Sequence, residues 1–238
     1  RAHVIPILRS REWKRVDLLG APALEFGAGK RDLSVWGGYQ LELSDAKELG
    51  PVAVATYHPA YIMRDADMLP LFYNDLNRSL EPAPEENVIE ADLNDFPSPV
   101  LSLDLETTSA DDYSQDIRIR LVAVSNKPYV GYCFRWSEEV AAKLKAALES
   151  TSELYGHNII GFDLAVLQAH GISFDWGGRC QVWDTMLMHH ALWPALSGAH
   201  DLGTLGRQYT SQFPWKAWRE LDSLEETYAC RDASYTLA

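Results

Sequence analysis

Hydrophobic and polar residues alternate most clearly in the second half of the chain. Residues 100–105 read Val-Leu-Ser-Leu-Asp-Leu, and residues 119–125 and 129–134 are further β-prone runs. An apolar period of two is typical of strands, so three strands are predicted to open this region. A short fourth strand is predicted at residues 154–155.

Helical patterns follow and interrupt these strands. Apolar residues share one face over 137–148, where Ser137 can cap the helix. Two further helices are predicted over 163–170 and 185–192. Strands and helices mixed in this order predict an α/β or α+β fold around one central sheet.

The first 80 residues contain three readable pieces. Residues 16–23 form an apolar run, and residues 52–64 predict a strand that leads into a helix. A further helix is predicted over 69–80. These pieces predict a separate α/β domain over 1–80.

The net charge of −13 by itself argues against binding to nucleic acid, but the charge is unevenly distributed. Residues 81–99 carry six acids, no basic residue and four prolines, which predicts an extended linker between domains 1–80 and 100–238. A solvated loop within one domain is the alternative. Three scattered cysteines suit a reducing compartment. Without a signal-peptide pattern or a long apolar run, we expect a cytoplasmic protein and no membrane partner.

Acidic residues recur at positions that suggest chemistry. Asp104 and Glu106 share one face of a strand and repel each other unless a cation lies between them, although a surface strand also carries such pairs. Asp163 begins a predicted helix, where it could instead act as a cap. Tyr228 and Asp232, four residues apart, share a helical face.

Taken together, these residues resemble the DEDD family of 3′–5′ exonucleases, in the subgroup with a tyrosine four residues before the last aspartate. Residues 156–164 resemble the family's second motif, and residues 184–194, 200–206 and 214–216 resemble proofreading domains of phage DNA polymerases. The resemblance implies an RNase H-like mixed sheet with flanking helices and two bound Mg²⁺ or Mn²⁺ ions.

The resemblance also implies roles for individual residues. The implied metal ligands are Asp104, Glu106, Asp163 and Asp232, and Tyr228 would orient the attacking water. Thr107, Thr108 and Asn158 would contact the substrate. The implied reaction releases nucleoside 5′-monophosphates from a single-stranded or frayed DNA 3′ end. A polymerase domain in the same parent chain is the implied partner, and host cytoplasm the location if a phage encodes it.

The N-terminal domain carries a weaker resemblance. The strand end Tyr57-His58-Pro-Ala resembles the C-terminal half of bacterial, iron–sulfur-related uracil-DNA glycosylases, whose histidine contacts the uracil. The family's water-activating motif and a cysteine set for a cluster are both missing, so we expect no base excision. A structural or surface histidine is the alternative for His58.

Two other functions are compatible with the same residues. The acids cannot distinguish DNA from RNA, so a free-standing exoribonuclease is one alternative. A catalytically silent DNA-binding or scaffold module is the other, which four intact acids disfavour. Four tryptophans could stack on bases but are more often core or interface residues, namely Trp183, Trp193, Trp215 and Trp218.

Overall fold

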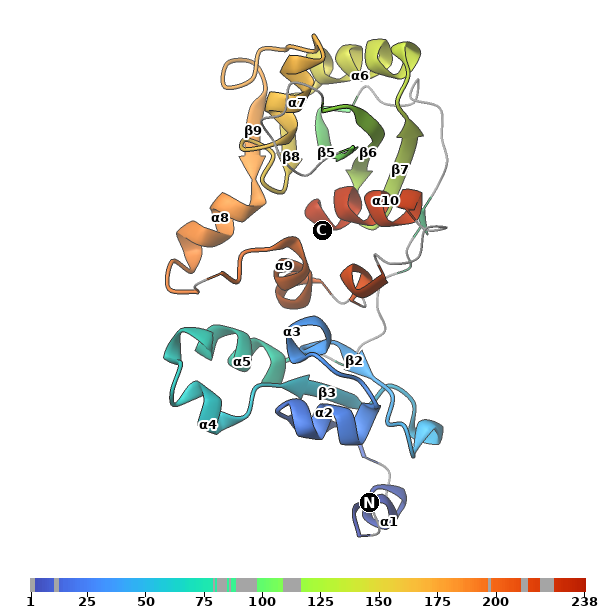
Figure 1. Ribbon diagram of the computed structural model, residues 1–238, viewed down its shortest axis with the longest axis vertical. Coiled ribbons are helices and arrows are strands. Elements are labelled where there is room, and N and C mark those ends of the chain that lie inside the picture. The colour runs from blue at the N-terminus through green and yellow to red at the C-terminus, as the bar shows by residue number, and fades with distance from the viewer. Residues whose placement is uncertain are drawn as a thin grey trace. The chain divides into compact units, whose positions relative to one another are not determined.

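A computed structural model describes residues 3–10, 13–78, 80, 85, 87–88, 98–108, 117–196, 198–210, 214–218 and 225–238. The chain forms two compact units (Figure 1). The first comprises Arg1–Pro84, Ala195–Ala199 and Gly203–Ala217, and the second Glu85–Pro194, His200–Leu202 and Trp218–Ala238. Two late segments thus group with the N-terminal residues, whereas the sequence prediction assigned all of 100–238 to one domain.

The second unit is built on a six-stranded mixed sheet with the order β4-β7-β6-β5-β8-β9. Its strands are β4 (Asn87–Val88), β5 (Val100–Thr107), β6 (Ile119–Lys127), β7 (Val130–Arg135), β8 (Glu153–Gly156) and β9 (Gln181–Asp184). Strands β5, β6 and β7 are antiparallel neighbours, whereas β5, β8 and β9 run parallel. The carboxyl ends of β5, β8 and β9 therefore meet at one edge of the sheet.

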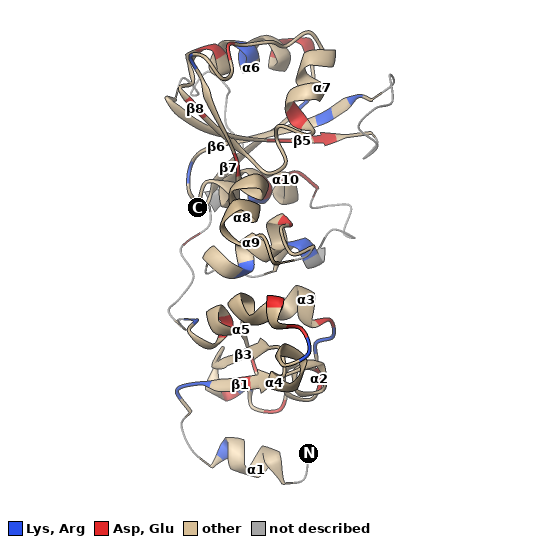
Figure 2. Cartoon of the chain, turned by 90° about the vertical axis from the view of Figure 1, so that its left-hand side faces the viewer, with Lys and Arg blue, Asp and Glu red and all other residues tan. Residues whose placement is uncertain are grey.

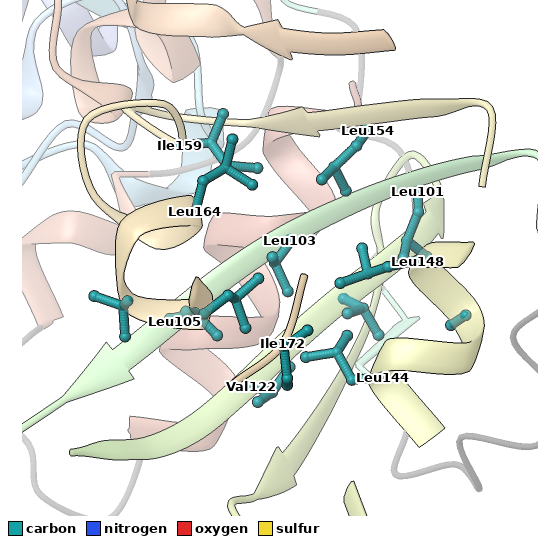
Figure 3. Packing of buried hydrophobic residues seen from close by; sticks show 14 of the residues in the cluster. Leu101, Leu103, Leu105, Val122, Leu144, Leu148, Leu154, Ile159, Leu164 and Ile172 are labelled. Carbon is teal, nitrogen blue, oxygen red and sulfur yellow. The ribbon is translucent and has the colours of Figure 1, made fainter. Parts of the chain in front are cut away.

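One face of this sheet forms the larger hydrophobic core. Helices α6 (Glu138–Ser150) and α7 (Asp163–Ala169) contribute side chains to this core. Leu101, Leu103 and Leu105 alternate along β5 and are buried with Leu144 of α6 and Leu164 of α7 (Figure 3). The period-two pattern thus places every second β5 side chain in the core and leaves the polar residues between them on the opposite face.

The opposite face is covered by α10 (Glu225–Thr236). Ala229 and Ala233 of this helix pack against Ala123 of β6. The helix lies so close to β7 that a Cβ atom at Gly131 would collide with the carbonyl oxygen of Cys230. Small residues on both sides therefore allow α10 to lie directly on the strands.

The first unit is a smaller α/β structure with a three-stranded sheet, β1-β3-β2, in which β1 and β3 are parallel. Its strands are β1 (Val16–Leu19), β2 (Gln40–Leu41) and β3 (Ala53–Thr56). Its helices are α1 (Val4–Arg9), α2 (Ala21–Ala28), α3 (Leu33–Trp36), η1 (Lys47–Leu49), α4 (Pro59–Ile62), η2 (Ala66–Met68) and α5 (Leu69–Leu76). Most of α9 (Leu202–Tyr209) and of η4 (Trp215–Trp218) also belongs to it.

A buried ion pair connects α9 to this first unit. Arg207 and Asp75 are 3% and 0% exposed, and the Arg207 Nε donates to Asp75 Oδ1 at 3.0 Å. Thr56 donates a further hydrogen bond to Asp75, and the Arg207 guanidinium lies over the Tyr57 ring. A late segment of the sequence thereby completes the polar core of the N-terminal unit.

The predicted RNase H-like mixed sheet with flanking helices is confirmed. The predicted strands in the second half match β5 to β8, and Ser137 caps α6 by accepting a hydrogen bond from the Val140 amide. Strand β9 was not predicted. The glycosylase-like part of the fold stays a prediction.

The predicted linker over 81–99 lies mostly outside the described residues. Within it, Asn87 and Val88 form the edge strand β4, which pairs in parallel with β7. In the described ranges, no helix is both long and apolar enough to cross a membrane.

Candidate active site

Three of the predicted acids meet above the centre of the larger sheet. Asp104 and Glu106 project from β5, and Asp232 projects from α10 on the same face. One carboxylate oxygen from each lies within 4.8 Å of the other two. Asp232 is buried, whereas the two strand acids are half-buried. Figure 2 shows acidic positions along β5 and at the beginning of α7.

Local contacts hold these carboxylates together. Ser102, one alternation before Asp104, donates its hydroxyl to the Ala233 carbonyl at 2.6 Å and so ties α10 to β5 beside Asp232. The β5–β6 pairing shifts register between Glu106 and Thr107, an irregularity of the kind that redirects side chains next to active sites. Sequence reasoning missed Ser102, although its place in the alternation was a signal.

Salt bridges fix the first turn of α10. Arg120 of β6 pairs with Glu225 at 2.7 Å, and Arg135 of β7 pairs with Glu226 at 2.6 Å. Acidic residues in a first turn also interact favourably with the helix dipole. Each exposed pair contributes little to stability, and both lie in the first turn of the helix that carries Asp232.

Asp163, the fourth predicted acid, lies next to this cluster but is not among the three that converge. Its Oδ1 accepts a hydrogen bond from the Leu105 amide at 3.0 Å, between the two strand acids. Burial raises the pKa of Asp163 to about 8, and the negative charges of Asp184 and Glu106 also raise it. Backbone amides of Asp163 and Leu105 act in the opposite direction.

Asp184 organises the loop that leads to α7. It is buried, and its carboxylate accepts hydrogen bonds from the amides of Asn158 and Ile160, at 3.0 and 3.2 Å. It also caps α8 (Thr185–Leu192) through the Met186 and Leu187 amides. Asp184 was not predicted as a site residue. Its position before a helix signalled a cap, but nothing in the sequence indicated the second set of bonds.

The predicted substrate contacts lie at, or just after, the carboxyl ends of β5 and β8. Asn158 adopts a left-handed conformation with φ of 58°, and its side chain closely approaches Gly161 in the turn before α7. Thr107 ends β5, and Thr108 exchanges hydrogen bonds with the Arg118 backbone. Tyr228 is half-buried on α10, one turn before Asp232. Their contact with substrate stays a prediction.

His58 lies in the first unit, between β3 and α4. Its exposed side chain caps α4, because Nδ1 accepts a hydrogen bond from the Ala60 amide at 3.1 Å. This contact leaves Nε2 as the protonated nitrogen of the neutral ring. A structural function for His58 is therefore visible, and a contact with a base stays a prediction.

The donor set of the cluster fits a divalent cation. Carboxylate oxygens are the ligands that Mg²⁺ and Mn²⁺ prefer, and three of them within 4.8 Å place strong negative charge at one point. Repulsion among these groups destabilises the cluster unless a cation compensates it. Asp104, Glu106 and Asp232 would hold such an ion, with Asp163 adjacent.

The larger sheet is mixed, and its central strand β5 carries two of the three clustered carboxylates. Residues 80–238 match the family described as 3′–5′ exonuclease. The chain belongs to this 3′–5′ exonuclease family, which confirms the prediction of a hydrolytic exonuclease.

Solved structures of nucleases are also similar to this chain. One, described as the apo form of a nuclease, is 21% identical with a TM-score of 0.48, covering 63% of this chain and 74% of its own. Brucella melitensis NrnC bound to pGG is 19% identical, with a TM-score of 0.46. The match covers 64% of this chain and 77% of the NrnC chain. Escherichia coli RNase D, described as an exoribonuclease involved in structured RNA processing, is 18% identical, with a TM-score of 0.41 and coverages of 64% and 42%. No curated protein sequence matched.

Proposed function

We propose that this protein removes nucleotides one at a time from a single-stranded or frayed DNA 3′ end, in a reaction that requires two Mg²⁺ or Mn²⁺ ions. The observation that carries the proposal is the convergence of Asp104, Glu106 and Asp232 in a member of the exonuclease family. Bound divalent cations supply an activated water and stabilise charge on the leaving 3′ oxygen.

The protein's own residues position the reactants. Asp104, Glu106, Asp163 and Asp232 serve as the ligands. Tyr228, one helical turn before Asp232, orients the attacking water through its phenolic oxygen. The terminal nucleotide contacts residues at the carboxyl ends of β5 and β8, namely Thr107, Thr108 and Asn158.

The biological role we propose is proofreading beside a polymerase domain, for which the support is the resemblance of residues 184–194, 200–206 and 214–216 to phage proofreading domains. RNA is the alternative substrate, because carboxylates hold a cation whether or not a 2′-hydroxyl is present. For the N-terminal unit we propose no base excision, because the glycosylase-like stretch lacks a water-activating motif.

The test measures trimming of 5′-labelled single-stranded DNA and RNA of the same sequence, with Mg²⁺, with Mn²⁺ and with EDTA. We expect metal-dependent release of nucleoside 5′-monophosphates from DNA. Asp104→Ala with Glu106→Ala should abolish it, whereas Glu138→Ala with Glu139→Ala, which removes two exposed acids from α6, should not. Activity that survives the first pair of substitutions would contradict the site assignment. Preference for RNA would favour the exoribonuclease, and DNA binding without turnover the silent module.

A primer–template pair tests the proofreading role. A primer with a mismatched 3′ nucleotide frays more readily than a matched primer and should be shortened faster. Equal rates on both primers would argue against proofreading while leaving the exonuclease assignment intact.

A further inference from the structure

Two aromatic residues share the sheet face that carries the acidic cluster. Ser102 of β5 pairs with Tyr155 of β8, which pairs with Trp183 of β9. Residues paired across neighbouring strands point to the same side of a sheet. Because Ser102 and Asp104 point toward α10, Tyr155 and Trp183 must lie on that face too.

The burial of the neighbouring residues supports this placement. Leu154 is part of the core on the α6 and α7 side, and Val182 packs against the same core. Side chains alternate along a strand, so the residues that follow these two point away from the core. Tyr155 and Trp183 are accordingly only partly buried, and Trp183 is 38% exposed.

The two rings form a stacked pair. Their centroids are 6.4 Å apart and their planes differ by 23°. The Tyr155 hydroxyl donates to Glu153 at 2.8 Å, which fixes the orientation of its ring. Trp183 belongs to the edge strand (Figure 1), so Tyr155 stacks on it from the inner side. Part of the Trp183 side chain stays exposed beside the pair.

The pair lies close to the acidic cluster. Two strand spacings and two residues along the strand separate Asp104 from Trp183, which corresponds to ~12 Å between their Cα atoms. Exposed apolar side chains of Ile160 and Leu187 follow β8 and β9 at the carboxyl edge. A single strand whose 3′ end lies at the carboxylates is therefore within reach of the rings.

Charge also favours stacking as the means of contact. The chain carries a formal net charge of −13, part of which lies in the acidic residues at the site, so contacts that neutralise phosphates are disfavoured around it. An aromatic ring binds a base through its π-face, without requiring positive charge and without selecting a particular base.

We propose that the Tyr155–Trp183 pair is a base-stacking site, which receives an unpaired nucleobase of the strand a short distance upstream of the scissile bond. This inference rests on the proposed exonuclease function and assigns a binding site to it. The ligand is an unpaired nucleobase, which single-stranded DNA and RNA both carry, so the site accepts a base from either.

The test compares Trp183→Ala with Trp176→Ala, which removes a tryptophan that is 49% exposed and precedes β9 at its amino end. The substrates are an oligothymidylate, the matching oligouridylate and the p-nitrophenyl ester of thymidine 5′-monophosphate, which has no upstream base. Trp183→Ala should raise KM for the preferred oligonucleotide by roughly 5- to 150-fold and leave ester hydrolysis unchanged. Trp183→Phe should restore most of the loss, and Trp176→Ala should change neither substrate.

Abasic substitutions locate the stacked base. Replacing one base at a time, counted back from the 3′ end, should weaken binding to the wild type at one position and leave Trp183→Ala unaffected there. An unchanged KM in Trp183→Ala, or an equal loss on the oligonucleotide and the ester, would overturn the proposal.

Failure of the proposed function has a different signature. In that case the wild type hydrolyses neither substrate. Quenching of Trp183 fluorescence by the oligonucleotide, measured as the difference between wild type and Trp183→Phe, then still decides whether a base stacks on this residue. The absence of such a difference would refute the stacking site by itself.

Discussion

Asp163 provides the sharpest test of how the candidate site is built. Replacing it with Asn keeps an oxygen that can accept the Leu105 amide hydrogen bond and removes the ionisable group. The substitution therefore separates the charge of this residue from its shape. We expect Asp163→Asn to stabilise the metal-free protein at neutral pH, although it removes a residue assigned to the active site.

The magnitude follows from the pKa of Asp163, which rises from 3.8 to about 8 on folding, chiefly through burial. One pKa unit corresponds to about 1.4 kcal/mol, and the folded protein retains a proton that the unfolded chain has released. At pH 7 the free energy of unfolding is thereby lowered by an amount on the order of 4 kcal/mol. Asn, which carries no such proton, should recover part of this amount.

The direction of the pKa shift determines how the stability advantage of Asp163→Asn changes with pH. A group whose pKa is raised on folding contributes its full stability below the unfolded pKa and loses it as pH rises through the folded pKa. The advantage of Asp163→Asn should be near zero at pH 4. It should grow by up to about 1.4 kcal/mol per pH unit toward pH 8 and level off above that value.

The assay is urea unfolding in EDTA from about pH 4 to 9, following the transition that shifts when Mg²⁺ is added, because that transition reports the second unit. Asp175→Asn, which changes an exposed carboxylate of the same unit, is the control and should show no such trend. An Asp163→Asn protein that is less stable than wild type, or whose advantage does not change with pH, would refute the reasoning.

Three further predictions concern the support of the site and of the first unit. Arg207→Met should lower the free energy of unfolding by roughly 3–5 kcal/mol by leaving Asp75 buried without its partner, and urea titration should show that adding Asp75→Leu restores much of the loss. Gly131→Ala should displace α10 and reduce kcat for single-stranded DNA by about 10²-fold, and unchanged turnover would contradict the close packing. Asp184→Ser should retain the α8 cap, as circular dichroism would show, yet lower nuclease activity because the Ile160 amide loses its acceptor. Full activity would show that the loop does not need this bond.

The fold of the second unit was largely accessible from the sequence because its elements carry strong local signals. Strand β5 alternates without interruption, and Ser137 begins α6 as a typical capping residue. Strand β9 carries no such signal, because it is a four-residue edge strand with exposed and buried positions mixed. Short edge strands depend on the neighbouring strand for their structure, and local sequence does not encode that neighbour.

Some residues of the candidate site were predictable from the sequence and others were not. The sequence predicted four acids at one site, Asp104, Glu106, Asp163 and Asp232. Three of these carboxylates converge, and Asp163 lies beside them. The part played by Asp184 could not be predicted, because it depends on a loop 24 to 26 residues earlier in the chain. The buried pairing of Arg207 with Asp75 spans 132 residues and was equally hidden. Long-range polar contacts leave no periodicity in a sequence.

The net charge of −13 can be assigned in part to particular regions of the chain. Six of the negative charges lie in residues 81–99, and up to four belong to the acidic residues in and beside the cluster. Folding the metal-free chain requires like charges to approach one another or, at Asp163, to retain a proton. A cation relieves both penalties, so metal binding and stability are coupled, and the coupling is reciprocal. In the proposed site Asp163 is a metal ligand, so Mg²⁺ would displace its proton and should stabilise wild type more at pH 8 than at pH 6, a difference that Asp163→Asn should lack.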